Sequence, residues 1–381
     1  MTQSSALRDL KICSMNVVRL PLLLPTVLLL LGPTPATAFD ELIVTPEMFG
    51  AVGDGKANDW RPIQLALMAC TAAVYNSSTT IHRSCRVRFT RSYLSGPLLV
   101  NSSWTTLEIT AGAMLKMLPK PSYIVACPQK GCPFITAGDG AEGCRTIYPN
   151  PHAPEQGYEV CLERVTITGS GTISGGATWS PSSWWLCART FNTSPNCWRP
   201  SFLTFQRVLG LTINGSLTLT DSPAHFIRLS GNNVNAHVSG VTLNASYFSP
   251  NTDGINVYGG FDTLLENAVI DNGDDCVSIV PTGEGIDGGR FCFSSPADVL
   301  CSGGHVVLRN FTCNGGHGLS IGGIRHGTVQ NVTFSNSTLT GGQDGSTQDE
   351  AAGGGELILF TVTVCANPAN DLTCPPSYIN I

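Results

Sequence analysis

The chain has 381 residues, which is enough for one large domain with a substantial hydrophobic core. Its apolar fraction of 42% excludes a disordered chain, and a net charge of −6 without a cluster of lysine or arginine argues against binding to nucleic acid or to an acidic membrane surface. Short apolar runs alternate with glycine, serine, threonine and asparagine. This composition is typical of an all-β protein with many turns.

The fifteen cysteines indicate a protein of an oxidising compartment. Cys13 lies ahead of or inside the leader, so an even number remains downstream, and no pair has the spacing of a zinc site. A high density of Asn-x-Ser/Thr sequons agrees with a secreted glycoprotein. The sequons begin at Asn76, Asn101, Asn192, Asn214, Asn244, Asn310, Asn331 and Asn336.

Residues 1–38 have the form of a secretory signal peptide. Arg19 precedes the apolar run Leu20–Leu31, and Ala36-Thr37-Ala38 supplies a small-x-small cleavage signal. A start at Met15 would leave a leader of more ordinary length. The alternative is a membrane anchor, but the run is short for a membrane span and contains a proline. We therefore predict a secreted, extracellular protein.

A glycine-rich turn and then a helix are expected at the start of the domain. Phe49–Gly55 reads Phe-Gly-Ala-Val-Gly-Asp-Gly, but it lacks the residue order of a phosphate-binding loop. Asp59 is placed to cap a helix that has Pro62 in its first turn. Apolar residues then follow at helical spacing: Trp60, Ile63, Leu67 and Cys70. Such a helix would cover the open end of a solenoid, whose last coil otherwise exposes apolar strand faces and unpaired backbone.

From Val87 onward the chain is a row of short apolar strands separated by glycine, asparagine, aspartate or serine. Imperfect repeats of roughly 20–30 residues, each holding two or three strands, predict a right-handed parallel β-helix. The alternative is a β-sandwich. A sandwich would need antiparallel hairpins with tight two-residue turns, and the sequence shows no convincing series of them.

Four tryptophans lie close together in the sequence, around Cys187 and Cys197: Trp179, Trp184, Trp185 and Trp198. Two interpretations are open for them. They could stack on sugar rings, or they could cover an edge of the core, as tryptophans more often do.

Three carboxylates occur in two motifs that are about one coil apart. The motif Asn251-Thr252-Asp253-Gly254 comes first, and Gly273-Asp274-Asp275-Cys276 follows, with 21 residues from Asp253 to Asp274. Equivalent positions in adjacent coils of a β-helix lie about 4.8 Å apart. Carboxylates that crowd together raise one another's pKa, so that one can stay protonated as an acid. Glycoside hydrolysis needs one such acid and one carboxylate that acts from the other side of the sugar ring.

A third motif, Gly316-His317-Gly318, follows the two acidic motifs. His317 could donate to a substrate or tune the protonation of the acid. Each motif alone has a simpler interpretation: an ordinary turn, half of a calcium site, or an incidental histidine. Their order and near-coil spacing favour a carbohydrate-cleaving site. This chemistry requires no metal and no organic cofactor.

The three motifs, in this order, resemble the signature of the polygalacturonases, glycoside hydrolase family 28. Four further segments match the same family: Phe49–Gly55, Tyr93–Pro97, Gly169–Gly175 and Asp221–Pro223. The likeness runs from about Thr45 to Gly345. It implies a pectin-lyase-like right-handed β-helix that hydrolyses α-1,4-galacturonosyl links of pectin with inversion.

The resemblance also implies a role for each site residue. Asp274 is expected to be the general acid, Asp253 and Asp275 to hold and activate the water, and His317 to assist. Substrate contacts are expected from Asn251, Gly316 and Gly318. The resemblance implies a Cys276–Cys313 disulfide beside the site. Cys292 and Cys301, in what looks like an inserted loop, are a second candidate pair.

The chain departs from the family near its end. The family carries an Arg-Ile-Lys motif that holds the substrate carboxylate, but the corresponding positions here read Thr347, Gln348 and Asp349. An acidic residue facing a galacturonate would repel it. We therefore divide the chain into the leader, a β-helix domain of residues 39–345 and an atypical tail, 346–381. The tail is either an aberrant end or a genuine departure with altered or lost activity.

The sequence thus predicts a secreted, monomeric glycosidase that acts on pectin, with no nucleic-acid partner and no membrane contact after signal cleavage. The rival hypothesis is a catalytically impaired pectin-binding protein on the same scaffold, because the basic motif is absent. A third possibility is a relative that acts on rhamnogalacturonan or xylogalacturonan.

Overall fold

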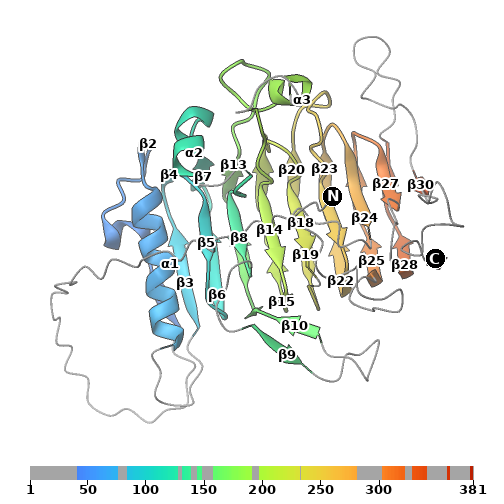
Figure 1. Ribbon diagram of the computed structural model, residues 1–381, viewed down its shortest axis with the longest axis horizontal. Coiled ribbons are helices and arrows are strands. Elements are labelled where there is room, and N and C mark those ends of the chain that lie inside the picture. Colours follow the sequence, from blue (N-terminus) through green and yellow to red (C-terminus); the bar gives the residue numbers. More distant parts are fainter. Residues whose placement is uncertain are drawn as a thin grey trace, which may run out of the picture. The chain divides into compact units, whose positions relative to one another are not determined.

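The part of the chain that the structure describes consists mainly of short parallel strands in three long sheets (Figure 1). The structure is a computed structural model. It describes residues 41–75, 84–127, 131–138, 144–147, 158–190, 197–231, 233–280, 303–321, 328–340, 358–360 and 378–380. The signal-peptide prediction, the Cys292–Cys301 pair and residues 347–349 all lie outside these ranges.

Three sheets, named A, B and C, contain most of the strands. In order across the sheet, sheet A contains β1 (Leu42–Val44), β3 (Cys85–Phe89), β6 (Thr105–Ile109), β12 (Thr166–Gly169), β16 (Thr212–Ile213), β19 (His237–Ser239), β22 (Gly260–Glu266), β25 (Gly303–Arg309), β28 (Thr328–Ser335) and β31 (Tyr378–Asn380). Sheet B contains β2 (Asp54–Asn58), β4 (Ser92–Ser95), β7 (Met114–Met117), β13 (Thr172–Ser174), β17 (Thr218–Thr220), β20 (Thr242–Asn244), β23 (Val269–Asp271), β26 (Thr312–Cys313) and β29 (Thr338–Leu339). Sheet C contains β5 (Leu98–Val100), β8 (Ile135–Ala137), β14 (Leu203–Gln206), β18 (Ile227–Ser230), β21 (Ile255–Tyr258), β24 (Asp275–Val280), β27 (Gly318–Ile321) and β30 (Ile358–Phe360).

The chain visits sheets A, B and C in turn, so each coil adds one strand to each sheet. The coil β19–β20–β21 pairs in parallel with the coil β22–β23–β24 at all three positions. Within the described residues the one antiparallel pair is β9 (Arg145–Ile147) with β10 (Tyr158–Val160), and a short parallel pair joins β11 (Leu162–Glu163) to β15 (Val208–Leu209). This topology confirms the predicted β-helix and excludes the sandwich.

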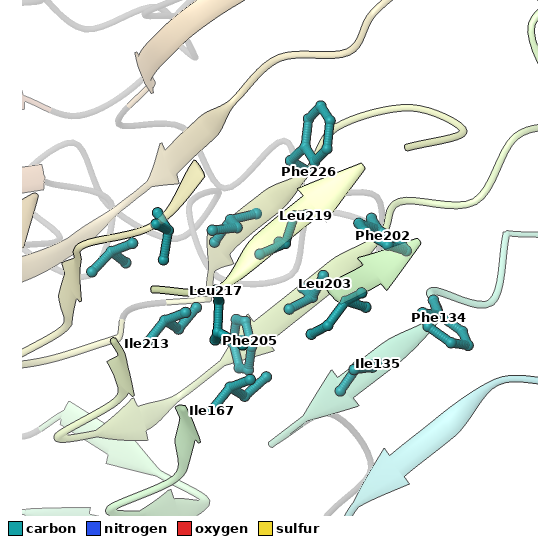
Figure 2. Close-up of a cluster of buried hydrophobic side chains, with 14 of the residues drawn as sticks. Phe134, Ile135, Ile167, Phe202, Leu203, Phe205, Ile213, Leu217, Leu219 and Phe226 are labelled. Carbon is teal, nitrogen blue, oxygen red and sulfur yellow. The ribbon is translucent and has the colours of Figure 1, made fainter. Parts of the chain in front are cut away.

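In-register stacking of apolar side chains forms the core. In sheet A, Ile167 pairs with Ile213, which pairs with Val238. Sheet B repeats the arrangement with Ile173, Leu219 and Leu243, and all six of these side chains are fully buried. Side chains from sheets A and C lie together in the interior of the coil, as Figure 2 shows for Ile167, Ile213 and Phe205. Because successive residues of a strand point to opposite faces, every second position builds this core.

One helix covers the N-terminal end of the sheets, as predicted. Helix α1 (Trp60–Tyr75) lies against β3, β4 and β5 and buries Ile63, Leu67 and Cys70 completely or nearly so. The Cys70–Cys85 disulfide ties it to β3. The predicted capping role of Asp59 is wrong in one respect. Its carboxylate accepts the backbone N–H groups of Val52 and Gly53, at 2.7 and 3.1 Å, and so fixes the glycine-rich turn instead of the free N–H groups of the helix.

The tryptophan cluster is part of the core edge. Trp184 and Trp185 are buried, and Trp179 and Trp198 pack against the core from outside. The Trp185 indole donates to the backbone oxygen of Ser222 at 2.9 Å. Short elements surround the sheets: a 3₁₀ helix at Pro46–Phe49, α2 (Lys120–Ala126) and α3 (Leu186–Thr190). Among the described helices, none is long and apolar enough to cross a membrane.

Phe205 provides a test of the core. Its ring is fully buried inside the coil, so Phe205→Ala should lower the free energy of unfolding by about 3–5 kcal/mol, because the coil cannot collapse around the cavity. Val269→Ala, at a position 40% exposed on sheet B, should cost about 0.5 kcal/mol or less. Urea denaturation of both variants measures the difference. Equal losses would contradict the predicted packing.

Candidate active site

A row of polar side chains lies at the N-terminal ends of three adjacent strands of sheet C. Ile227, Ile255 and Val277 are register partners, so the residues two positions earlier, His225, Asp253 and Asp275, stand in line. Backbone bonds continue this register, since Phe226 N donates to Asp253 O at 2.8 Å and Gly254 N to Asp275 O at 2.8 Å. The two acidic motifs thus lie in adjacent coils, and the register places Asp275 in line with Asp253.

Two glycines allow the turns of adjacent coils to approach. A Cβ at Gly273 would lie 2.1 Å from the backbone oxygen of Ser249, and a Cβ at Gly316 would lie 1.6 Å from that of Asp274. Gly316 also has a φ of +63°, which side chains rarely adopt. The close backbone contact therefore explains why glycine occupies position 316. The substrate contact expected of Gly316 stays a prediction. Gly318 begins β27 and is the register partner of Asp275.

Buried bonds hold the acidic turn. The Asn272 side chain donates to the backbone oxygens of Thr252 and Asp275, at 2.9 and 2.8 Å. A disulfide joins Cys276, directly after Asp275, to Cys313 in the next coil, which is the pair that the family resemblance implies. These bonds fix the turn that carries the acidic motif against the coil that carries His317.

His317 bridges two carboxylates. Its Nδ1 lies 3.3 Å from Asp274 Oδ1 and 3.5 Å from Asp275 Oδ1, and its backbone N–H donates to Asp274 O at 3.1 Å. Hydrogen bonding to Asp274 and Asp275 raises the pKa of His317 to about 10, so the imidazole is protonated at neutral pH. Burial alone would raise the pKa of Asp274, but the hydrogen bond and charge of His317 outweigh it and lower that pKa.

Asp253 is in the opposite electrostatic situation. It is 7% exposed, and its Oδ2 accepts from the Asn256 side chain at 2.7 Å. Burial, and then the negative charge of Asp274, raise the pKa of Asp253 to about 8. Asp253 is therefore protonated at mildly acid pH while Asp274 is ionised beside His317. The carboxyls of Asp253 and Asp274 together therefore retain one proton at mildly acid pH, in addition to the proton on His317.

The sequence did not indicate two further residues of the site. His225 Nε2 lies 3.6 Å from Asp253 Oδ1, and burial, followed by the charge of Arg228, lowers the pKa of His225 to about 3, so the ring is neutral. Arg199 Nη2 donates to Asn251 Oδ1 at 2.5 Å, and Asn251 Nδ2 lies 3.4 Å from Asp274 Oδ2. Aligning the strands after His225 and Asp253 could have found the histidine, but no sequence signal marks Arg199.

Asp274, Asp275 and His317 could form a metal site by geometry alone, since one ligand atom from each lies within 4.8 Å of the others. Metal binding to His317 requires a neutral imidazole with a free lone pair. The raised pKa of His317 keeps the ring protonated up to about pH 10, which favours an ion pair over metal ligation. The arrangement is suited to proton transfer between carboxyl groups and a bound substrate.

Comparison with known proteins identifies the family of the chain. The sequence profile described as Glycosyl hydrolases family 28 matches residues 158–350, about half of the chain. The chain therefore belongs to glycosyl hydrolases family 28. It is 30% identical to polygalacturonase-2 of Solanum lycopersicum over 189 residues, which are 48% of this chain and 36% of that protein. It is 25% identical to a polygalacturonase of Malus domestica over 285 residues, 72% of this chain and 56% of that protein.

The fold has solved counterparts. An exopolygalacturonase from Thermotoga maritima superposes with a TM-score of 0.55 at 21% identity, over 77% of this chain and 66% of that one. At this identity the likeness shows the fold, and it confirms the predicted right-handed β-helix. The chain spans between 36% and 56% of the length of the first curated relatives that it matches.

The raised pKa of Asp253 has a consequence for stability. Its pKa is about 8 in the folded protein against 3.8 for an ordinary aspartate, so the unfolded chain releases this proton first as the pH rises. Unfolding free energy is therefore lost between about pH 4 and pH 8. Asp253→Asn removes the loss and should raise the melting temperature at pH 8 by a few degrees, about 2–4 °C for each kcal/mol regained.

The effect of Asp253→Asn should become small at pH 4, where Asp253 is neutral in the folded protein and only about half ionised in the unfolded chain. Asp271→Asn, at an exposed position on β23, is a matched control and should change the melting temperature little at either pH. Calorimetric scans at pH 4, 6 and 8 measure the trend. A gain from Asp253→Asn that does not depend on pH would contradict the assigned protonation.

Proposed function

We propose that the chain hydrolyses α-1,4-galacturonosyl links of pectin by an inverting acid–base mechanism. The observation that carries the proposal is the contact of His317 with Asp274 and Asp275, one coil away from a protonated Asp253. Such a group of carboxyls supplies both an acid and an ionised base at mildly acid pH. Membership of family 28 supports the same reaction class.

In the proposed reaction Asp274 gives its proton to the glycosidic oxygen as the bond from that oxygen to the anomeric carbon breaks. Asp253 and Asp275 hold a water whose oxygen attacks the anomeric carbon, and one of them accepts the proton that the water loses. His317 keeps its own proton and stabilises the negative charge left on Asp274. Asn251, Gly316 and Gly318 are proposed to line the substrate path.

The mechanism requires the shared proton to change place when substrate binds. In the free protein Asp253 has the raised pKa and Asp274 the lowered one. Carboxyls that interact this strongly titrate as a group, so the position of the proton depends on what lies against each oxygen. A glycosidic oxygen against Asp274 accepts a hydrogen bond from its protonated form, and a water against Asp253 donates to its ionised form. Both contacts favour the arrangement that the reaction needs.

We further propose that the protein is secreted as a monomer and meets its polysaccharide outside the cell. Five disulfides among the described residues support an oxidising location: Cys70–Cys85, Cys127–Cys132, Cys144–Cys161, Cys187–Cys197 and Cys276–Cys313. In this proposal residues 1–38 are removed as the leader.

The rival is a pectin-binding protein with impaired catalysis on the same scaffold. The observation in its favour is the sequence Thr347-Gln348-Asp349, where the resemblance leads one to expect Arg-Ile-Lys. A relative acting on rhamnogalacturonan or xylogalacturonan is the remaining alternative, and assays on those polymers test it directly.

Turnover separates the enzyme from the binder. The full chain should release reducing ends from polygalacturonate at mildly acid pH, and Asp275→Asn should lower kcat by at least about 100-fold, because general acid–base groups contribute that much or more. The same variant should keep its affinity for the polymer. A folded chain that binds polygalacturonate but releases no reducing ends would instead establish the rival.

The pH profile tests the shared proton. Since kcat/KM reports the free enzyme, it should hold through mildly acid pH and fall only as the pH rises towards about 8, where Asp253 loses its proton. His317 stays charged over this range, because its pKa is about 10. If kcat/KM instead fell as the pH rose through about 4, the range of ordinary aspartates, the carboxyls of the free site would not retain a proton at mildly acid pH.

A further inference from the structure

Arg199 joins the turns of three successive coils beside the acidic site. Its Nη1 donates to the backbone oxygen of Pro223 at 3.3 Å and to that of Pro250, and its Nη2 donates to Asn251 Oδ1 at 2.5 Å. Asn251 is in turn the residue whose amide faces Asp274. The guanidinium is thus fixed against Asn251, whose side chain lies between Arg199 and Asp274.

The positive charge of Arg199 has no direct ionic partner in the described chain. Its hydrogen-bond acceptors are all neutral, and no described carboxylate oxygen lies within 4.0 Å of it. Burial lowers the pKa of Arg199, while the charges of Asp253 and Asp274 act in the opposite direction, so the guanidinium lies within electrostatic range of both. It remains charged at any ordinary pH.

Two N–H donors of Arg199 remain for a ligand. A guanidinium has five N–H groups, and the contacts to Pro223, Pro250 and Asn251 use three of them. The side chain is partly exposed. Two donors in a fixed planar fork match the two oxygens of a carboxylate, which is the group that arginine binds best.

The other cations near the site are less suited to this task. His317 is engaged with Asp274 and Asp275. Arg228 is 4% exposed, donates to Ser201 Oγ at 3.1 Å, and lies over the Tyr258 ring with its guanidinium carbon 5.0 Å from the ring centroid. Arg199 is therefore the cation of the described site that can meet an acidic sugar.

We propose that Arg199 binds the carboxylate of a galacturonate unit held beside Asp274. The inference rests on the proposed function, in which the substrate is a chain of such acids. Among the described residues of the three motifs, the charged His317 is already paired with Asp274 and Asp275, so a uronate carboxylate would otherwise meet these two acids without a cation of its own. Arg199 would then favour the free acid over its neutral methyl ester. The same guanidinium also orients Asn251.

The test compares two ligands in a background that binds without turnover. The full chain with Asp275→Asn is titrated calorimetrically with trigalacturonate and with its fully methyl-esterified form at mildly acid pH. Adding Arg199→Met should raise the Kd for trigalacturonate by roughly 10- to 100-fold, the range for a charge-assisted pair, and change the Kd for the ester by less than about 2-fold. Arg199→Lys, which keeps the charge but loses the fork, should fall between the two.

Arg309→Met is the matched control. It removes the same charge from an exposed arginine of sheet A that pairs with Glu266 at 2.7 Å, and it should leave both affinities unchanged. Equal weakening of acid and ester by Arg199→Met would mean that Arg199 only fixes the turns, and unchanged affinities would mean that it does not touch the ligand. Either result overturns the inference.

Failure of the proposed function is seen at an earlier step. If the parental chain with Asp275→Asn binds neither trigalacturonate nor polygalacturonate, the polymer is not the substrate and the inference falls with it. If Arg199→Met fails to fold, the affinities of Arg199→Lys for the acid and the ester test the inference instead. A loss of affinity for the acid alone supports the carboxylate contact, and an equal loss for acid and ester refutes it.

Discussion

The parallel register between coils is the constraint on which the rest of this structure depends. Each strand pairs with its counterpart one coil away, so the residues that lie side by side in a sheet are about one coil apart in the sequence. The same register that stacks Ile227, Ile255 and Val277 in the core also lines up His225, Asp253 and Asp275 two positions earlier in each coil. Core and site therefore depend on the same register of sheet C, and a change in coil length would disrupt both.

Such stacking brings like charges together, and the site shows three physical answers to the resulting repulsion. Asp274 and Asp275 share a protonated imidazole, Asp253 keeps its proton, and the Arg199 guanidinium lies within range of the group. None of these is a buried ion pair sealed from solvent. Each of the three arrangements leaves a charge or a proton available to a ligand. Keeping the proton on buried Asp253 lowers the stability of the folded protein above about pH 4.

The elements that could be predicted from the sequence are those with a local signal. Helical spacing predicted α1, recurrent short strands predicted the β-helix, and compact motifs marked Asp253, Asp274 and His317. Arg199 could not be found in this way, because its partners are mostly backbone oxygens and its contact with Asn251 spans 52 residues. The role of Asp59 was missed for a related reason: the composition of a helix start does not reveal that a nearby turn binds the carboxylate first.

The Cys276–Cys313 disulfide makes the geometry of the site depend on oxidation of two cysteines. Both sulfurs are buried, and the bond joins the coil of Asp274 and Asp275 to the coil that leads to His317. The alignment of imidazole and carboxylates is thus reinforced by an oxidation step that takes place while the chain folds. Protein made in a reducing cytosol would lack this crosslink. Lack of activity in such a preparation could therefore result from the missing disulfide and would not show that the site is unable to catalyse the reaction.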